Sequence, residues 1–159
     1  MRRISVQEED FDAGAELARL TGGGAGGVAS FIGVVRGEAD GRKLAALRLE
    51  HYPGMTEAAL ARLADAALAR WALTGVIIIH RVGRLLPAQN IVLVATASAQ
   101  RAAALAATAY LIDRLKTDAP FWKAEEFADG AVRWVSARPG DEAAAAAWQK
   151  DLPPGPDRL

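Results

Sequence analysis

The sequence predicts an α+β fold, a single domain in which mixed or antiparallel sheets pack against helices. Strand patterns follow one another without an intervening helix, in the order β-α-β-β-α-β-β-α-β-β-α, and this order does not build a doubly wound parallel sheet. The chain has 159 residues, of which 52% are hydrophobic, so one domain with a buried core is expected. Because no internal repeat divides the chain, we expect this domain to span residues 1–150, with a proline-rich tail over residues 151–159.

The chain begins with a short strand and a helix. Residues 3–6 have a strand pattern, and Asp10 is expected to cap a helix that continues to about Leu20. The glycine-rich run over residues 21–27 ends this helix. It lacks the Gly-Lys-Ser/Thr ending of a phosphate loop, and no strand directly precedes it, so we expect a turn.

Two strands and a long amphipathic helix follow. Residues 28–35 are mostly apolar, and in residues 44–51 the side chains of Leu47 and Leu49 share one face, so both segments are expected to be strands. After a Pro-Gly break, Thr56 is expected to cap a helix with apolar residues at helical spacing. These residues are Leu60, Leu63, Ala64, Ala67, Leu68 and Trp71.

Two apolar strands and a second long helix come next. Residues 76–80 and 90–98 are rich in β-branched residues, which is typical of buried strands. Ser98 is expected to cap a helix over residues 99–116, and Pro120 prevents that helix from continuing, since proline lacks the N–H that a helix interior requires.

A hairpin and a final helix complete the pattern. Residues 123–127 and 132–137 predict two strands joined around Asp129 and Gly130, a dipeptide that favours tight hairpin turns. The alanine-rich segment over residues 142–150 predicts the last helix.

Composition excludes several classes of function. The formal net charge is 0, so no overall charge attracts the chain to nucleic acid or to an anionic membrane. The absence of cysteine excludes disulfides, thiolate metal sites and a cysteine nucleophile. With only His51 and His80, no multi-histidine metal site and no cofactor are expected, and both histidines are expected to be structural. No signal peptide and no apolar run of membrane-spanning length are found, so a cytoplasmic protein is expected.

The segment over residues 115–123, Leu-Lys-Thr-Asp-Ala-Pro-Phe-Trp-Lys, is the strongest functional signal. It contains Lys116 and Lys123, two of four lysines, in a chain with fifteen arginines. A lysine amine beside apolar residues can donate, accept or attack, because its pKa falls readily on desolvation. The same residues also fit a helix C-terminus with a cation on its dipole and a hydrophobic stop.

Three arginines and a glutamine are candidate anion-binding residues. Arg36 ends an apolar strand, and Arg138 follows one, positions equally typical of a solvent-exposed strand end. Arg101, beside Gln100, lies at a helix N-terminus, which favours a bound phosphate or carboxylate. Because fifteen residues of helix span roughly 22 Å, Arg101 and Lys116 reach one small substrate most easily from different subunits. A homodimer with composite sites is therefore a hypothesis of the sequence.

Several strings with consistent order and spacing resemble the MoaE family, the large catalytic subunits of molybdopterin synthase. They are Phe-Ile-Gly-Val-Val-Arg at 31–36, Leu-Glu-His-Tyr-Pro-Gly-Met-Thr at 49–56, His-Arg-Val-Gly at 80–83, Ser-Ala-Gln-Arg at 98–101, residues 115–123, Arg-Trp-Val at 133–135 and Ala-Arg at 137–138. The similarity covers about residues 27–148. It implies the α/β-hammerhead fold of that family.

The resemblance also implies a reaction and an assembly. Such enzymes are sulfurtransferases of molybdenum cofactor biosynthesis. They convert cyclic pyranopterin monophosphate to molybdopterin, with sulfur from the C-terminal Gly-Gly thiocarboxylate of a small ubiquitin-like, MoaD-like subunit. Their assembly is a heterotetramer with a central homodimer of the large subunit. The alternative function is a non-catalytic subunit that binds a pterin phosphate or docks the partner.

Residue roles are carried over on matching positions. The resemblance implies that Lys116 lies near the thiocarboxylate and that Lys123 is a second active-site lysine. The expected substrate-binding residues are Arg36, Gln100, Arg101 and Arg138, with Arg138 on the side of the partner's tail. Gln100 departs from the family, which commonly has histidine there, so a titratable imidazole is absent at this position.

Overall fold

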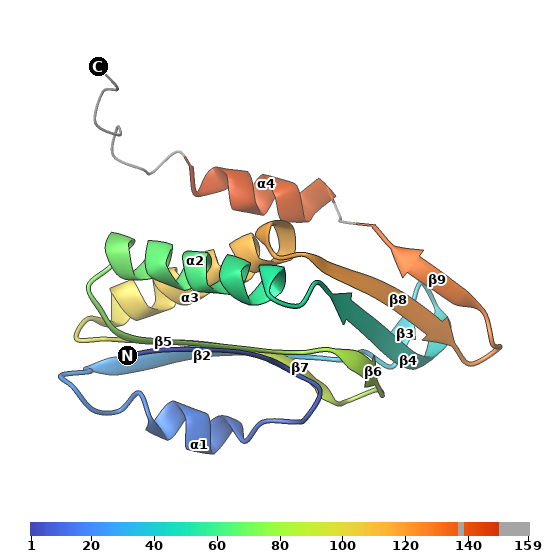
Figure 1. Ribbon diagram of the computed structural model, residues 1–159, viewed down its shortest axis with the longest axis horizontal. Helices are drawn as coiled ribbons and strands as arrows, with labels where there is room; N and C mark the ends of the chain where they lie inside the picture. The colour runs from blue at the N-terminus through green and yellow to red at the C-terminus, as the bar shows by residue number, and fades with distance from the viewer. Residues whose placement is uncertain (137–138, 150–159) are drawn as a thin grey trace.

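The computed structural model describes residues 1–136 and 139–149, which fold into two sheets and four helices. The α+β class predicted from the sequence is confirmed (Figure 1). No helix in these residues combines the length and apolar character needed to cross a membrane. Nor do these residues bring together three or more histidine or acidic side chains that could hold a metal ion.

The first sheet has four strands in the order β1-β5-β7-β2. Their bounds are β1 (Arg2–Gln7), β5 (Leu73–Arg81), β7 (Asn90–Ser98) and β2 (Gly27–Val34). Strands β1 and β5 are parallel, and the other neighbours are antiparallel. Since β2 is last in this order, one of its edges is open in the described part of the chain.

Helices cover both faces of the first sheet, as Figure 1 shows. Helix α1 (Ala13–Ala18) lies on one face, and α2 (Met55–Arg70) and α3 (Arg101–Asp118) lie on the other. Side chains alternate across a strand, so successive residues of β5 and β7 supply two cores. One core contains Ile77, Ile79, Leu93 and Phe11; the other contains Ile78, Val94, Leu60, Leu63, Leu111 and Leu115.

The second sheet extends from one end of the first (Figure 1). Its order is β3 (Glu38–Ala39), β4 (Arg42–His51), β8 (Phe121–Phe127) and β9 (Val132–Val135), and β6 (Gly83–Leu85) also pairs with β4. Helix α4 (Pro139–Ala147) packs on α3. Just after α4, the indole Nε1 of Trp148 donates to Asp113, 2.7 Å away, and this bond ties the end of the described chain to α3.

Three helix starts differ from the prediction. Asp12, not Asp10, caps α1, and Asp10 instead accepts hydrogen bonds from the Phe11 amide and from Asn90. Thr56 is buried inside α2, where its hydroxyl donates to the Tyr52 carbonyl, because the cap position is Gly54 at φ 83°. Helix α3 begins at Arg101 after Gln100; the predicted cap, Ser98, accepts from the Gln100 amide in the preceding turn.

Other differences concern short elements and ends. The sequence pattern missed β3 and β6, which have two and three residues and too little alternation to detect. Strand β8 starts at Phe121, two residues earlier than predicted. Helix α4 starts at Pro139, three residues earlier than predicted, since proline is well suited to a first helical turn. The predicted ends of the last strand and the last helix, Ala137 and Lys150, lie outside the described residues.

Candidate active site

A hollow of about 310 Å³ opens where α3 ends and β8 begins. It is lined from both sheets, from the end of α3 and from the start of α4. The lining residues are Arg36, Leu49, His80, Leu115, Lys116, Ala119, Phe121, Lys123, Val135, Ser136 and Asp141. Three of the six residues predicted from the sequence, Arg36, Lys116 and Lys123, are therefore brought together.

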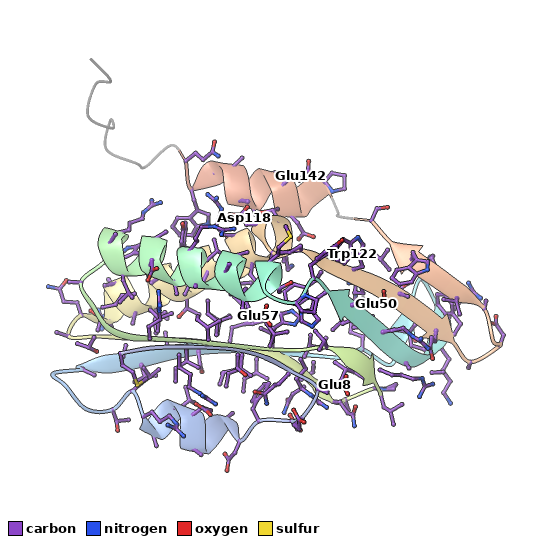
Figure 2. The ribbon with its side chains drawn as sticks, in the orientation of Figure 1. Glu8, Glu50, Glu57, Asp118, Trp122 and Glu142 are labelled. Atoms are coloured by element: carbon purple, nitrogen blue, oxygen red, sulfur yellow. The ribbon has the colours of Figure 1, made fainter. Side chains whose placement is uncertain are left out.

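The chain reversal after α3 places the two lysines. Ala119 leaves the helix with extended angles (φ −93°, ψ 131°), and Pro120 cannot continue it, so β8 starts at once. Lys116 thus occupies the last turn of α3 and Lys123 the third position of β8. Figure 2 labels Asp118 and Trp122 on either side of this reversal.

Strand register turns Lys123 toward the hollow. Lys123 lies opposite Leu49 of β4 and Val135 of β9, and opposed residues of antiparallel strands share a face. All three line the hollow. Lys123 is half-buried, whereas Lys116 is exposed, so the two amines meet the hollow in different environments.

In the described lining of the hollow, one carboxylate accompanies three cations. Asp141, in the first turn of α4, lies 3.2 Å from Nζ of Lys116 through Oδ1. Because the lysine side chain is 53% exposed, this ion pair contributes little to stability. Among the described residues that line the hollow, three cations stand against one carboxylate, and this excess of positive charge suits an anionic ligand.

His80 forms a buried wall of the hollow. Its ring stacks on that of Phe121 with centroids 3.8 Å apart, and Nδ1 lies 2.8 Å from the carbonyl oxygen of Arg81. A carbonyl only accepts, so Nδ1 carries the proton and Nε2 keeps a lone pair. The pKa of His80 is lowered to about 4, mainly by burial and in smaller part by the nearby His51, while the hydrogen bond to the Arg81 carbonyl opposes the shift.

This depressed pKa predicts a loss of stability in acid. Unfolding restores a pKa of 6.5, so below that pH the unfolded chain binds a proton that the folded chain does not. Stability therefore falls as pH drops through 6.5, and the loss is complete below about pH 4. Between pH 7 and pH 5, His80 alone should reduce the free energy of unfolding by about 2 kcal/mol.

Urea unfolding of the wild type and His80→Asn at pH 7, 6 and 5, at one protein concentration, measures this effect. Asparagine does not titrate and can still donate to the Arg81 carbonyl. Between pH 7 and pH 5, the free energy of unfolding of the variant should therefore fall by about 2 kcal/mol less than that of the wild type. If the free energies of unfolding of the two proteins change with pH in parallel, His80 has the same charge in the folded and the unfolded chain, and the prediction is wrong.

The other predicted residues lie elsewhere. Gln100 and Arg101 are exposed at the opposite end of α3 and do not line the hollow of their own chain. A Cβ on Gly27, the first residue of β2, would lie 3.8 Å from Cα of Arg101, so Arg101 adjoins the start of that strand. Arg138 lies outside the described residues.

Sequence reasoning missed two titratable residues of the hollow, His80 and Asp141. His80 was expected to be only structural, although the string His-Arg-Val-Gly at 80–83 was among the family matches and could have drawn attention to it. Asp141 follows Lys116 by 25 residues, and no periodicity or motif links a residue of α4 to the end of α3.

Comparison with known proteins gives a consistent result. A family model described as MoaE protein matches residues 6–118. The molybdopterin synthase catalytic subunit of Ralstonia nicotianae is 55% identical over 93% of this chain and 85% of its own length. The structure of the molybdopterin biosynthesis MoaE protein from Burkholderia ambifaria is 47% identical, with a TM-score of 0.78 over 94% of this chain and 99% of that chain. The structure of molybdopterin synthase from Staphylococcus aureus is 30% identical, with a TM-score of 0.77 over 82% of this chain and 95% of that chain.

Proposed function

The chain belongs to the MoaE family, and from this premise we propose that it is the sulfur-transferring catalytic subunit of a molybdopterin synthase. The acceptor is cyclic pyranopterin monophosphate. The donor is the C-terminal thiocarboxylate of a small ubiquitin-like subunit. Each transfer forms one carbon–sulfur bond on the pterin side chain as a carbon–oxygen bond there breaks. Water then cleaves the acyl–sulfur bond, which leaves the sulfur on the pterin and an ordinary carboxylate on the partner.

The observation that carries this proposal is the meeting of Lys116, Lys123 and Arg36 in one hollow of a chain without cysteine. A sulfur supplied on a partner's tail removes the need for a thiol here. The two amines can bind the thiocarboxylate and move protons as the acyl group is transferred and hydrolysed. The guanidinium of Arg36 suits the substrate phosphate, which it can bind through two parallel hydrogen bonds.

We further propose that two copies of the chain complete each site across the open edge of β2. Four apolar side chains of this strand are exposed, Val28, Phe31, Ile32 and Val34. An edge strand with exposed apolar side chains favours pairing with another strand. Side chains alternate along β2, so both faces of the edge carry apolar side chains, and each of them would gain cross-strand neighbours if the sheet continued into a second copy.

A two-fold axis through the middle of β2 makes the pairing antiparallel. The start of one strand then lies beside the end of the other. Arg101 adjoins the start of β2, and Arg36 follows its end by two residues. The partner's Arg101 is thereby brought toward Arg36 and the hollow. This arrangement supports the composite site that the length of α3 suggested, with Gln100 and Arg101 supplied from the second subunit.

Mixing two inactive variants tests the composite site. Arg101→Ala and Lys116→Ala proteins, once their subunits exchange, form heterodimers with one intact site and one doubly altered site. A 1:1 mixture should regain about one quarter of the wild-type activity, since half of the dimers are mixed and half of their sites are intact. A mixture of Lys116→Ala and Lys123→Ala is the matched control and should stay inactive, because both lysines come from one chain. Equal recovery, or none, in both mixtures would contradict the composite site.

A single-turnover assay tests the function itself. The protein is mixed with the thiocarboxylated small subunit and cyclic pyranopterin monophosphate, and the dithiolene product is detected by mass. We expect product at a rate that depends on both ligands. If the partner binds and no product forms, the chain is a non-catalytic binding or docking subunit. In that case Gln100, where the family commonly has histidine, is the first residue to replace.

A further inference from the structure

Side-chain hydrogen-bond acceptors are few among the described residues that line the hollow. Arg36, Lys116 and Lys123 are donors only, because protonated arginine and lysine have no lone pair to offer. The side-chain acceptors on the wall are Asp141, Ser136 and Nε2 of His80. Asp141 already accepts from Lys116, 3.2 Å away, and Ser136 is exposed at the rim. His80 is therefore the acceptor that is both buried and fixed.

Three contacts fix the imidazole of His80. The ring stacks on Phe121 at an interplanar angle of 19°, and Nδ1 donates to the Arg81 carbonyl, which determines the tautomer. His80 is only 5% exposed and is one of the residues that line the hollow. Among the described residues, the fully buried side-chain polar atoms without a hydrogen-bond partner are Nδ1 of His51 and Oγ1 of Thr74. Nε2 of His80 is not one of them, so this nitrogen is not completely buried in the core.

We propose that Nε2 of His80 accepts a hydrogen bond from a ring N–H or an O–H of the ligand in this hollow. The inference rests on the proposed function, which makes that ligand a pterin with several such donors and an anionic phosphate. The cations recognise the charge of the ligand, and His80 recognises its heterocycle. A ligand that presents a lone pair at this point would leave two acceptors facing each other, which is costly when buried. His80 is thus a residue that determines specificity.

NMR of the 15N nuclei in protein labelled with 15N-histidine detects this hydrogen bond directly. The chain has two histidines, so His51 supplies an internal reference. Addition of cyclic pyranopterin monophosphate to the full-length protein should shift the Nε2 resonance of His80 in the direction of an accepted hydrogen bond, with Nδ1 still protonated. Sulfate, which binds cations and carries no proton at neutral pH, should leave that resonance in place. An unmoved Nε2 at saturating pterin, or an equal shift with sulfate, would overturn the proposal.

Two substitutions separate recognition from structural support. The amide of His80→Asn can replace Nδ1 but does not reach the position of Nε2, whereas the longer side chain of His80→Gln does. Calorimetric titration of the pterin should give a Kd about 10-fold higher for His80→Asn and within about 3-fold of wild type for His80→Gln. Equal affinities in all three proteins, or equal losses in both variants that parallel a lower Tm, would assign His80 a structural role only.

Failure of this inference is distinguishable from failure of the proposed function. The resonance and the Kd are measured without the sulfur-carrying subunit, so they do not depend on turnover. If the Nε2 resonance shifts but the protein forms no dithiolene product, the contact with His80 is supported and the proposed enzymatic function is rejected. If product forms but the Nε2 resonance does not shift, the enzymatic function is supported and the contact with His80 is rejected. No binding of the pterin to the wild type would overturn both.

Discussion

Replacing Lys116 with alanine is expected to reduce the rate of sulfur transfer by roughly 10²–10⁴-fold, the range typical of a lost proton-transfer group. Lys116 lies in the last turn of α3 and lines the hollow. Under the proposed function, its amine contacts the thiocarboxylate and the acyl group left after transfer. Since the Lys116 side chain in its ion pair with Asp141 is 53% exposed, the loss should appear in the rate and not in the stability of the fold.

Two further variants make this result specific. Lys43→Ala removes another exposed lysine, at the start of β4, which does not line the hollow, and it should keep the wild-type rate. Lys116→Arg keeps the charge but replaces an amine that can titrate with a guanidinium that cannot, so it should stay slow. The single-turnover rate and Tm are measured for each. A wild-type rate for Lys116→Ala would remove this lysine from the chemistry. Full recovery in Lys116→Arg would reduce its role to charge alone.

The sequence was sufficient to predict the part of the site that local chain geometry builds. Lys116 and Lys123 are seven residues apart, and Pro120 between them dictates a helix stop followed by a strand. Because proline cannot continue a helix, the sequence alone predicts that both lysines lie near the point where the chain reverses direction between α3 and β8. The apolar runs of β5 and β7 were equally predictable, because buried strands select β-branched residues whatever their neighbours are.

The remaining part of the site depends on contacts between distant segments. Asp141 meets Lys116 only because α4 packs back on α3. His80 becomes a wall of the hollow because its ring stacks on Phe121, 41 positions later in the chain. The prediction of helix-cap residues was wrong for a related reason. Asp10 and Asp12 are equally good caps by composition, and the bond from Asn90, 80 residues away, is one that Asp10 makes and Asp12 does not.

Replacing Ile32 with glutamate is expected to convert the proposed dimer to a monomer and to remove activity, although every residue lining the hollow is unchanged. Ile32 lies on the open edge strand β2, and its side chain is 39% exposed. If β2 pairs with its symmetry mate, the substitution buries a carboxylate twice in each dimer without a cation to compensate, which is strongly unfavourable. Light scattering gives the mass, and the single-turnover assay gives the rate.

Leu86→Glu is the matched control, since Leu86 is 44% exposed, lies outside β2 and does not line the hollow. The control should remain a dimer with full activity, so a general cost of surface charge cannot explain the difference. A monomer that keeps full activity in Ile32→Glu would show that one chain suffices for the site and that the partner's Arg101 is not required. A dimer that persists would place the interface elsewhere than β2. A monomer that has lost activity would support the composite site, in which Arg101 of the second copy completes each hollow.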